Sequence, residues 1–391
     1  MSRWDKVKIK EAFSYVSRGK SPNYTEMSMT RVINQACIYW DGLHLEKVKY
    51  QDSTMVNADR YLNNNDVLVN STGTGTLGRC CVFTSNANDI KYIVDTHVTV
   101  LRPSDDICAS FFKYFIMRKE TQDCLYSKCV NGSTNQIELS KEKLLNFLIP
   151  LPPLETQKQI SKTLDTAEEL LAMRKQQLAE LDKLIKSTFC DMFGDPIINA
   201  KGWEGSTLGD CCNLIKDGPH VSPNYVEDGI PFVSVNNIIK GYWDLEKVKY
   251  ITREDYEKFG KRCKPEFGDV LYTKGGTTGY AKYVDRDFEF MNWVHIAVLK
   301  YKRELLNGIF LENMLNSDYC YNQAQLYTRG IANRDLVLGQ MSRITLFVPP
   351  IPLQTQFAAI VTKIEEQKTL VKKAIDETKY LFQSLMSDYF E

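Results

Sequence analysis

The chain has 391 residues, of which 43% are hydrophobic and 25% charged. This length is too great for one ordinary domain, and the composition is that of a soluble globular protein. With 49 basic and 49 acidic residues the formal net charge is zero, which disfavours a general polyanion binder that holds nucleic acid by overall charge.

The 11 cysteines form neither CxxC pairs nor metal-finger spacings, which indicates reduced thiols and a cytoplasmic protein. The N-terminal segment MSRWDKVKIK is charged and has no apolar core, unlike a signal peptide. No apolar run approaches the ~20 residues that a membrane-spanning helix needs.

Short strand-like runs, punctuated by Gly, Asn, Ser and Thr, characterise residues 1–153. We expect strands at Val67–Asn70, Cys80–Thr84 and Tyr92–Leu101, followed by a helix at Ala109–Gln122. The pattern predicts a mixed α+β domain.

A proline-rich segment, Ile149–Pro153, ends this domain, and helix is not expected to cross it because proline lacks a backbone donor. A long helix is expected directly afterwards, over 154–193, where glycine and proline are absent. Its apolar residues follow heptad spacing, interrupted at Arg174, at Ile160, Leu164, Leu171, Leu178, Leu181 and Ile185.

Residues 194–353 repeat this plan and predict a second α+β domain. The expected elements are strands at Pro231–Val235, Val270–Thr273, Ala281–Val284 and Trp293–Lys300 and a helix at Gly308–Leu326. A second proline-rich segment, Val348–Pro352, precedes a helix expected over 354–391. Its heptad residues are Ile360, Ile364, Val371, Leu381 and Leu385.

The repeat is also visible as identical peptides. LEKVKY occurs at Leu45–Tyr50 and again at Leu245–Tyr250, and SPNY occurs at 21–24 and 222–225. PLETQ at 153–157 is aligned in the same way with PLQTQ at 352–356. A duplicated domain plus helix indicates two modules that bind two related targets, or two halves of one target.

The expected fold class is therefore α+β. Two duplicated mixed α/β domains are joined by two long helices, which pair as an antiparallel coiled coil with pseudo-two-fold symmetry. The alternative is that each helix packs only on its own domain, although heptad patterns of this length are long for local packing.

Gly73–Gly78 matches GxGxxG, but strand-like residues follow it, and Lys274–Gly279 loses the spacing, so a dinucleotide or S-adenosylmethionine loop is disfavoured. Both copies keep a Gly/Thr-rich turn that can admit and hydrogen-bond a phosphate, with a cation nearby. An ordinary hairpin turn is the alternative. The candidate contacts around these turns are Ser71, Thr72, Thr74, Arg79, Lys274, Thr277, Thr278 and Lys282.

Two later loops correspond between the copies and carry side chains that can bond base edges. Their candidate residues are Asn131, Ser133, Asn135 and Gln136 in the first copy and Arg329, Asn333 and Arg334 in the second. His220 and Asn224 add a contact that varies, because the first copy has Arg18-Gly19-Lys20 before its SPNY. His97 and His295, set in apolar runs, are interpreted as structural.

Catalytic signatures are missing from the sequence. It has no (Asn/Asp)-Pro-Pro-(Tyr/Phe) methyltransferase tetrad, no PD…(D/E)xK nuclease core and no HExxH. We therefore expect no catalytic residues and no metal site in this chain.

The chain resembles the specificity (S) subunit of type I restriction-modification systems over essentially its full length. The likeness is carried by the duplication, DGPHVSPNY…GIPF at 217–232, GDVLYTKGGTTGYAKYV at 268–284, and the segments LPPLETQKQI at 151–160 and PPIPLQTQFAAI at 349–360. It implies that residues 1–153 and 194–353 are target-recognition domains, each contacting one half of a split DNA site.

The resemblance also implies the partners: double-stranded DNA, two methyltransferase (M) subunits and restriction (R) subunits. The M subunits would use S-adenosylmethionine to methylate adenine, and the R subunits would use ATP and Mg, so this chain itself needs no cofactor. The first copy departs from the family pattern at 18–42, which suggests that the two domains bind different sequences. A non-DNA coiled-coil scaffold is the alternative function, and a self-sufficient enzyme is a third.

Overall fold

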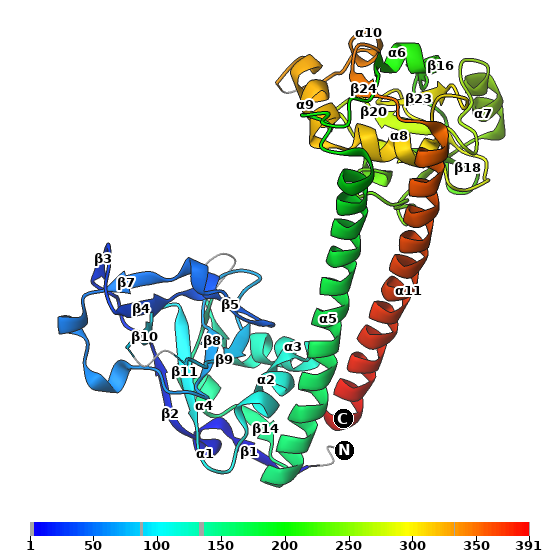
Figure 1. The fold of residues 1–391 in the computed structure, drawn as a ribbon. Helices are drawn as coiled ribbons and strands as arrows, with labels where there is room; N and C mark the ends of the chain where they lie inside the picture. Colours follow the sequence, from blue (N-terminus) through cyan, green and yellow to red (C-terminus); the bar gives the residue numbers. More distant parts are fainter. Residues whose placement is uncertain (1–3, 87–88, 133–136, 332, 391) are drawn as a thin grey trace. The chain divides into compact units, whose positions relative to one another are not determined.

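The computed structural model describes residues 4–86, 89–132, 137–331 and 333–390. The chain divides into two compact units (Figure 1). Unit 1 comprises Met1–Lys175 and Lys373–Glu391, and unit 2 comprises Gln176–Lys372. Each unit therefore contains one mixed domain, the first half of the helix that follows it and the second half of the other long helix.

The central sheet of unit 1 is antiparallel, with strand order β2-β11-β8-β9. Its strands are β2 (Phe13–Arg18), β8 (Val67–Asn70), β9 (Cys80–Val82) and β11 (Val98–Pro103). Side chains alternate between its faces: Val67 packs in one core with Phe112, whereas Leu68 packs in another with Ile33. Both faces are covered, which accounts for the apolar run in β8.

A second sheet of unit 1, with order β10-β4-β7-β3, covers one of these faces. Its strands are β3 (Tyr24–Thr25), β4 (Thr30–Ile33), β7 (Lys49–Gln51) and β10 (Lys91–Val94), with β4 and β10 parallel. The remaining pairs are β1 (Lys6–Lys8) with β14 (Leu148–Pro150), β5 (Ile38–Tyr39) with β6 (Gly42–Leu43), and β12 (Val130–Asn131) with β13 (Glu138–Leu139).

Helices cover the other face of the central sheet in unit 1. They are α1 (Ile9–Ala12), α2 (Ala109–Met117), α3 (Lys119–Cys129) and α4 (Lys141–Leu145), with short 3-10 turns at η1 (Gln35–Cys37), η2 (Leu45–Lys47), η3 (Ser53–Met55) and η4 (Ala58–Arg60). The predicted single helix Ala109–Gln122 is wrong. Arg118 has an extended backbone between α2 and α3, and its guanidinium donates a 3.1 Å hydrogen bond to the carbonyl of Phe390.

Unit 2 has the same architecture. Its sheets β16-β23-β20-β21 and β22-β18-β19-β17 match the two sheets of unit 1 strand for strand, including the one parallel pair, and β15-β24 matches β1-β14. The strands are β15 (Gly205–Thr207), β16 (Cys212–Asp217), β17 (Tyr225–Val226), β18 (Ile230–Val233), β19 (Lys249–Ile251), β20 (Val270–Thr273), β21 (Ala281–Tyr283), β22 (Met291–Asn292), β23 (Ile296–Tyr301) and β24 (Thr345–Phe347).

The helices of unit 2 are α6 (Leu208–Cys211), α7 (Arg253–Gly260), α8 (Gly308–Leu315), α9 (Asp318–Tyr327), α10 (Leu338–Met341) and the turn η5 (Val235–Asn237). The predicted helix Gly308–Leu326 is two helices, because Ser317 lies outside both and caps the second. The predicted strand Tyr92–Leu101 is likewise two strands, β10 and β11, which belong to different sheets. The expected duplication and the α+β class are confirmed.

Two helices of 40 residues, α5 (Leu154–Phe193) and α11 (Ile351–Phe390), contribute to both units. In unit 1, Ile160 and Leu164 pack with Met386 and Phe390, while Arg174 bonds Ala374. In unit 2, the rings of Phe189 and Phe357 are 5.5 Å apart, and Asp182 pairs with Lys368. Within each unit the helices are therefore antiparallel, as expected.

The heptad seam of α5 follows the prediction, whereas that of α11 follows it only in part. Ile360 is 38% exposed and Leu381 is 51% exposed, so neither is a seam residue. Ile364 and Val371 are buried, as predicted, together with Gln354, Phe357, Ala358, Val361, Ile375, Thr378, Met386 and Phe390. The predicted Leu385 is half-buried and packs in the cluster of Met386 and Phe390.

The structure aligns the helix starts differently, through two buried glutamines. Gln157 accepts the N–H of Cys108 at 2.9 Å and donates to the carbonyls of Asp106 and Pro152. Gln354 makes the same three bonds, to the N–H of Asn307 and the carbonyls of Leu305 and Pro349. Gln157 thus corresponds to Gln354, not to Gln356.

Helix α11 begins at Ile351, earlier than the predicted 354, and contains Pro352 in its first turn. Proline is tolerated there because the first N–H groups of a helix have no intrahelical acceptor. The helix therefore begins within the second proline-rich segment but does not cross it, as expected.

Both long helices end against an indole. Trp203 donates a 2.7 Å hydrogen bond to the carbonyl of Phe193, the last residue of α5. In unit 1, Trp4 donates a 3.3 Å hydrogen bond to the carbonyl of Tyr389, close to the end of α11. The second helix half is thus fixed to its domain in the same way in both units.

Charged residues interrupt both seams at different positions. Arg174 hydrogen-bonds Ala374 and Thr378 in unit 1. Lys368 pairs with Asp182 at 2.7 Å and Glu365 at 2.6 Å in unit 2.

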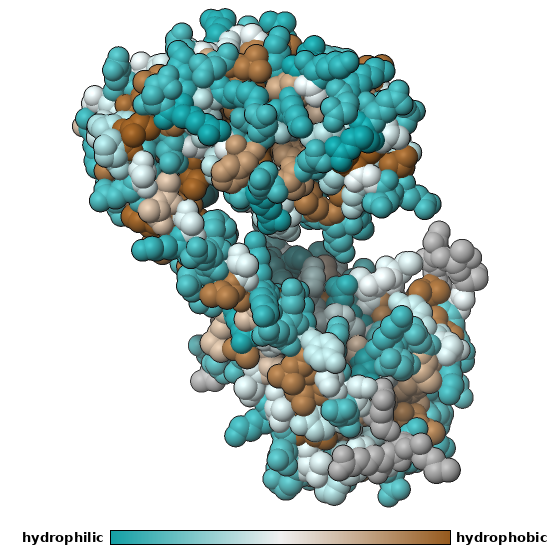
Figure 2. Space-filling view, turned by 90° about the vertical axis from the view of Figure 1, so that its right-hand side faces the viewer, coloured by the Kyte–Doolittle hydropathy of each residue, from teal (hydrophilic) through white to brown (hydrophobic). Residues whose placement is uncertain are grey.

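On the face of the molecule in Figure 2, hydrophobic side chains form small separate patches among hydrophilic ones.

Candidate nucleic-acid interface

In unit 2, three of the predicted loops meet where the strands of the central sheet end. Asp217, the last residue of β16, is 4% exposed and lies 3.2 Å from Nε2 of His220 and 3.7 Å from Nζ of Lys274. Arg262 donates hydrogen bonds to its carboxylate and its carbonyl. One nearly buried carboxylate therefore contacts the nearby imidazole of His220 and two cations, Arg262 and Lys274, from distant segments.

Lys274 joins this group to the loop that follows α9. Its Nζ lies 2.9 Å from the carboxylate of Asp335, and Asp335 forms isolated β-bridges with Gly275 and Arg329. The Gly/Thr turn and the predicted base-contacting loop are therefore held side by side.

Unit 1 joins the same two loops with the charges exchanged. Arg18 ends β2, as Asp217 ends β16, and its Nη1 lies 2.8 Å from Glu138. Ser71 occupies the place of Lys274, because its N–H bonds the carbonyl of His97 as that of Lys274 bonds His295. Glu138 bridges Thr72 as Asp335 bridges Gly275. Glu138 and Asp335 therefore occupy equivalent places, but the cation that pairs with the acid is Arg18 at the end of β2 in unit 1 and Lys274 after β20 in unit 2.

The sequence analysis placed His97 and His295 inside apolar strands, but the structure does not. His97 and His295 are exposed and lie in the turns just before β11 and β23. Nδ1 of His97 hydrogen-bonds Oγ1 of Thr72 at 2.8 Å. The ring of His295 lies so close to Gly275 that an added Cβ would be only 2.4 Å away, so this position requires glycine. Both histidines belong to the candidate interface.

The Gly/Thr turns connect β8 with β9 and β20 with β21. Gly75 and Gly276 have positive φ, of 81° and 69°, which favours glycine. Thr74 and Thr277 are exposed at the tips. Ser71 and Thr278 are buried and bond Thr99 at 2.5 Å and Thr328 at 2.9 Å, so these two hydroxyls support the turns from behind.

The two cations predicted near these turns differ. Lys282 is buried and pairs with Glu312 at 3.1 Å, so the interpretation of Lys282 as a surface cation is wrong. Arg79 is half-buried, donates to the carbonyl of Ile38 at 3.4 Å and lies 5.0 Å from the ring centre of Tyr39.

The other predicted contacts are mostly exposed. His220, Asn224, Arg329 and Asn333 are exposed, and Arg334 is half-buried with a hydrogen bond to Gln325. Asn131 accepts a 2.6 Å hydrogen bond from Lys143. Ser133, Asn135 and Gln136 lie outside the described residues.

Sequence reasoning missed the charged residues that join the loops: Arg18, Glu138, Asp217, Arg262 and Asp335. The one available signal was their position, because Arg18 and Asp217 each end a strand directly before a glycine. Their partners lie far along the chain, so no local pattern could reveal the pairs.

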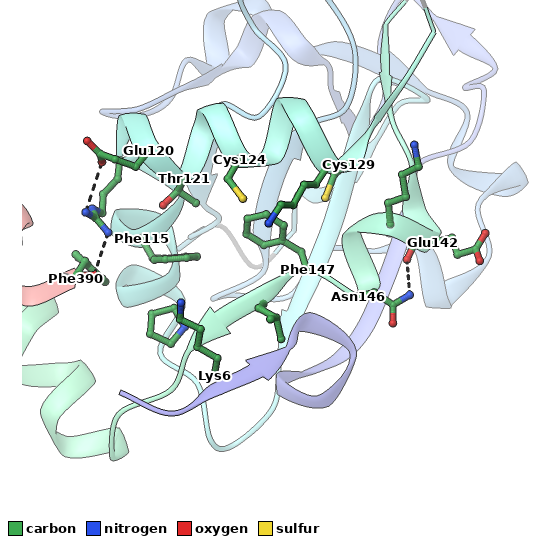
Figure 3. Close-up of a pocket in the computed structure, with 15 residues that line it drawn as sticks. Lys6, Phe115, Glu120, Thr121, Cys124, Cys129, Glu142, Asn146, Phe147 and Phe390 are labelled. Atoms are coloured by element: carbon green, nitrogen blue, oxygen red, sulfur yellow. Dashed lines mark hydrogen bonds and ion pairs between the residues drawn. The ribbon is translucent and has the colours of Figure 1, made fainter. Parts of the chain in front are cut away.

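A separate cavity of about 690 Å³ lies in unit 1 (Figure 3). Phe115, Cys124, Phe147 and Phe390 line it, together with Lys6. None of its lining residues belongs to the joined loops, so it is not part of the candidate interface.

Within the described residues, no cluster of His, Cys, Asp and Glu could hold a metal ion. Among the same residues, no helix combines the length and apolarity needed to span a membrane.

The fold and this interface define a duplicated recognition protein, in which one scaffold presents different polar groups at equivalent strand ends. The family model of the type I restriction modification DNA specificity domain matches residues 1–183 and 200–380. The chain therefore belongs to the type I restriction-modification specificity subunits, and the predicted resemblance is confirmed.

Relatives and solved structures agree with this membership. The type I restriction enzyme MjaVIII specificity subunit of Methanocaldococcus jannaschii is 21% identical over 98% of this chain and 92% of its own length. The MjaIX specificity subunit of the same organism is 22% identical over 73% of this chain and 68% of its own. The S subunit of a type I system from M. genitalium has a similar fold, with a TM-score of 0.62 at 16% identity, covering 100% of this chain and 96% of that one.

Proposed function

We propose that each unit binds one half of a bipartite DNA target, and that the chain thereby selects where partner subunits act. The exchange of charge between the joined loops carries this proposal. Arg18 and Asp217 occupy equivalent strand ends with opposite charge. Two units with one scaffold and different polar groups at the same place suit two different half-sites.

The chemistry is assigned to partners. We infer that M subunits methylate adenine with S-adenosylmethionine, that two of them bind this chain, and that R subunits use ATP and Mg to cleave. This chain supplies no catalytic group in the proposal, in keeping with the missing catalytic motifs in its sequence. Such a complex works on cellular DNA, so we place it in the cytoplasm.

The long helices are proposed to set the spacing between the half-sites. Each has 40 residues, which corresponds to about 60 Å of α-helix. Two recognition units that meet the same side of a duplex are separated by about one helical turn, ~34–36 Å. Bases between the half-sites would then be unread.

Methylome sequencing of a host that expresses this chain with its M subunits tests the function. The expected result is a bipartite adenine-methylated motif with a fixed spacer, which disappears when this chain is omitted. Methylation that does not depend on the chain, or M subunits that bind it without any DNA motif, would instead support the coiled-coil scaffold.

A further inference from the structure

The two peptides that the sequence repeats, LEKVKY and SPNY, meet on the second sheet of each unit. Tyr24, the last residue of SPNY, begins the edge strand β3, which pairs with β7, and Lys49 begins β7. In unit 2, Tyr225 begins the edge strand β17, and Lys249 begins its neighbour β19. The repeated peptides therefore form the same strands in both units.

In both units the lysine ammonium lies over the tyrosine ring. The distance from Nζ to the ring centre is 4.8 Å for Lys49 and Tyr24 and 4.7 Å for Lys249 and Tyr225. The tyrosines are 51% and 49% exposed, and both lysines are exposed. Neither lysine forms an ion pair with an acid in the part of the chain that the structure describes. Each unit thus presents an exposed, oriented ammonium that, among the described residues, no carboxylate contacts directly.

Packing accounts for some apolar positions of the repeated peptide, although Leu45 is 36% exposed, but not for these lysines. Val48 packs on one core of unit 1, and Leu245 packs on the corresponding core of unit 2. The alternate positions, which include Lys49 and Lys249, point to solvent. The retained exposed pair therefore indicates a surface contact that both units make.

In unit 1 the pair adjoins the candidate interface. Burial raises the pKa of Asp95, and the hydrogen bond from the backbone N–H of His97 and the charges of His97, Lys49 and Arg18 act in the opposite direction. Asp95 accepts the N–H of His97 at 2.9 Å, and Arg18 donates to the carbonyl of the next residue, Thr96, so Lys49 and Arg18 both lie near this short turn.

In unit 2 a row of aromatic rings makes the connection. Ring centres are 6.2 Å apart for Tyr225 and Phe232, 5.5 Å for Phe232 and Trp293, and 6.3 Å for Trp293 and His295. Tyr225 and Lys249 also line a groove of about 700 Å³ together with Trp293. The pair and the joined loops are parts of one surface.

A ligand feature common to both units must be the same in both half-sites. The bases differ between half-sites, whereas the sugar-phosphate backbone does not. A lysine ammonium binds phosphate as a point charge, and a tyrosine hydroxyl can donate to a phosphate oxygen. Burial, and secondarily the charge of Asp95, raises the pKa of Tyr24, so its hydroxyl remains a donor at neutral pH.

We propose that Lys49 with Tyr24, and Lys249 with Tyr225, are matched phosphate contacts that hold each unit on the DNA backbone irrespective of base sequence. The proposal rests on the DNA-binding function proposed above. It assigns a role to the strongest repeat in the sequence, which base recognition leaves unexplained.

The test uses the full chain in complex with its M subunits and two DNA duplexes, one with the methylated motif and one with both half-sites scrambled. Affinity is measured against salt concentration for the wild type, Lys49→Gln, Lys249→Gln and the double variant. We expect each single variant to weaken binding to both duplexes and to lower the slope of log K against log salt by about 1, and the double variant by about 2. The methylated motif should not change.

Two further variants are the controls. Lys49→Arg with Lys249→Arg retains the charges and should retain the slope. Lys264→Gln removes another exposed lysine of unit 2, whose Nζ lies 4.7 Å from the ring centre of Tyr256, and should also leave the slope unchanged.

Three outcomes would overturn the proposal while leaving the function intact. The first is an unchanged salt slope in the double variant. The second is an altered methylated motif, which would indicate base recognition. The third is weaker binding of the M subunits without a change in slope, which would indicate a protein contact. If the wild-type complex has no bipartite motif, the proposed function itself fails, and the inference fails with it.

Discussion

The two units differ most where their scaffolds are most alike, at the ends of β2 and β16. Unit 1 places Arg18 there and pairs it with Glu138, whereas unit 2 places Asp217 there and takes its cation from Lys274. The acid of the later loop, Glu138 or Asp335, is neutralised in both. The comparison shows that the scaffold requires a neutralised acid at this point but not a particular cation, so the exposed chemistry can diverge.

Removing the cation of unit 2 should have the largest effect. Lys274→Met leaves Asp217 and Asp335 without their shared lysine. We expect a cost of about 3 kcal/mol, the lower end for a broken buried ion pair, because Asp217 keeps Arg262 and the Asp335 side chain is 45% exposed. Hydrogen exchange should rise in unit 2 but not in unit 1, and the motif should degenerate in one half only. Ser71→Ala, at the equivalent position of unit 1, removes only a hydrogen bond to Thr99 and should have a smaller effect, confined to unit 1. Equal loss in both halves would contradict the assignment of one half-site to each unit.

Replacing the buried glutamines should affect both units alike. Gln157→Leu and Gln354→Leu each leave a buried N–H and two carbonyls without their partner, at a cost of about 1–3 kcal/mol. Local hydrogen exchange at the start of α5 and of α11 measures this. A clearly unequal cost would show that the helix attachments are not equivalent.

Transferring the charge arrangement of unit 2 to unit 1 tests the exchange directly. Arg18→Asp and Ser71→Lys should each destabilise unit 1 alone, while the double variant recovers part of the loss because the new lysine can neutralise both acids. A double-mutant cycle should give a coupling free energy of about 0.5–3 kcal/mol. Additive effects in thermal melting would argue against the equivalence of these positions.

The charged seam residue of unit 2 should matter least. Lys368 takes the place that Leu171 holds in α5, and its side chain is 12% exposed. Lys368→Leu should change the free energy of unfolding by less than about 1 kcal/mol or stabilise the unit, because apolar packing often replaces such ion pairs without loss. Lys368→Ala, which removes the packing too, should be less stable in the same melting experiment.

Local patterns predicted the parts of the fold that depend on short-range periodicity. The heptad spacing of α5 and the strands at Val67–Asn70 and Val270–Thr273 agree with the structure. In α11 the predicted seam residues Ile364 and Val371 are buried, whereas Ile360 and Leu381 are exposed. The repeated letters PLETQ and PLQTQ were matched in the sequence, whereas Gln157 and Gln354 correspond through their hydrogen bonds. At the break between α2 and α3, Arg118 hydrogen-bonds the carbonyl of Phe390, a contact too far along the chain for a local pattern to indicate.

The candidate interface was predictable only in outline. Gly/Thr turns and amide-rich loops are recognisable by composition, and in unit 2 the structure brings them together. The charges that join them, such as Arg18 with Glu138, are separated by most of a domain. Lys282 shows the opposite error, because its position near a turn gave no indication of Glu312 on a helix behind it.

The division of the long helices between the units has a consequence for folding during synthesis. Phe111 and Tyr114 of unit 1 are buried together with Met386 and Phe390, which the ribosome adds after all of unit 2 has been made. The domain that emerges first therefore waits with an uncovered apolar surface until the rest of the chain has been translated. A nascent chain stalled after Lys372 would contain every residue of unit 2 but would lack the second segment of unit 1, Lys373–Glu391.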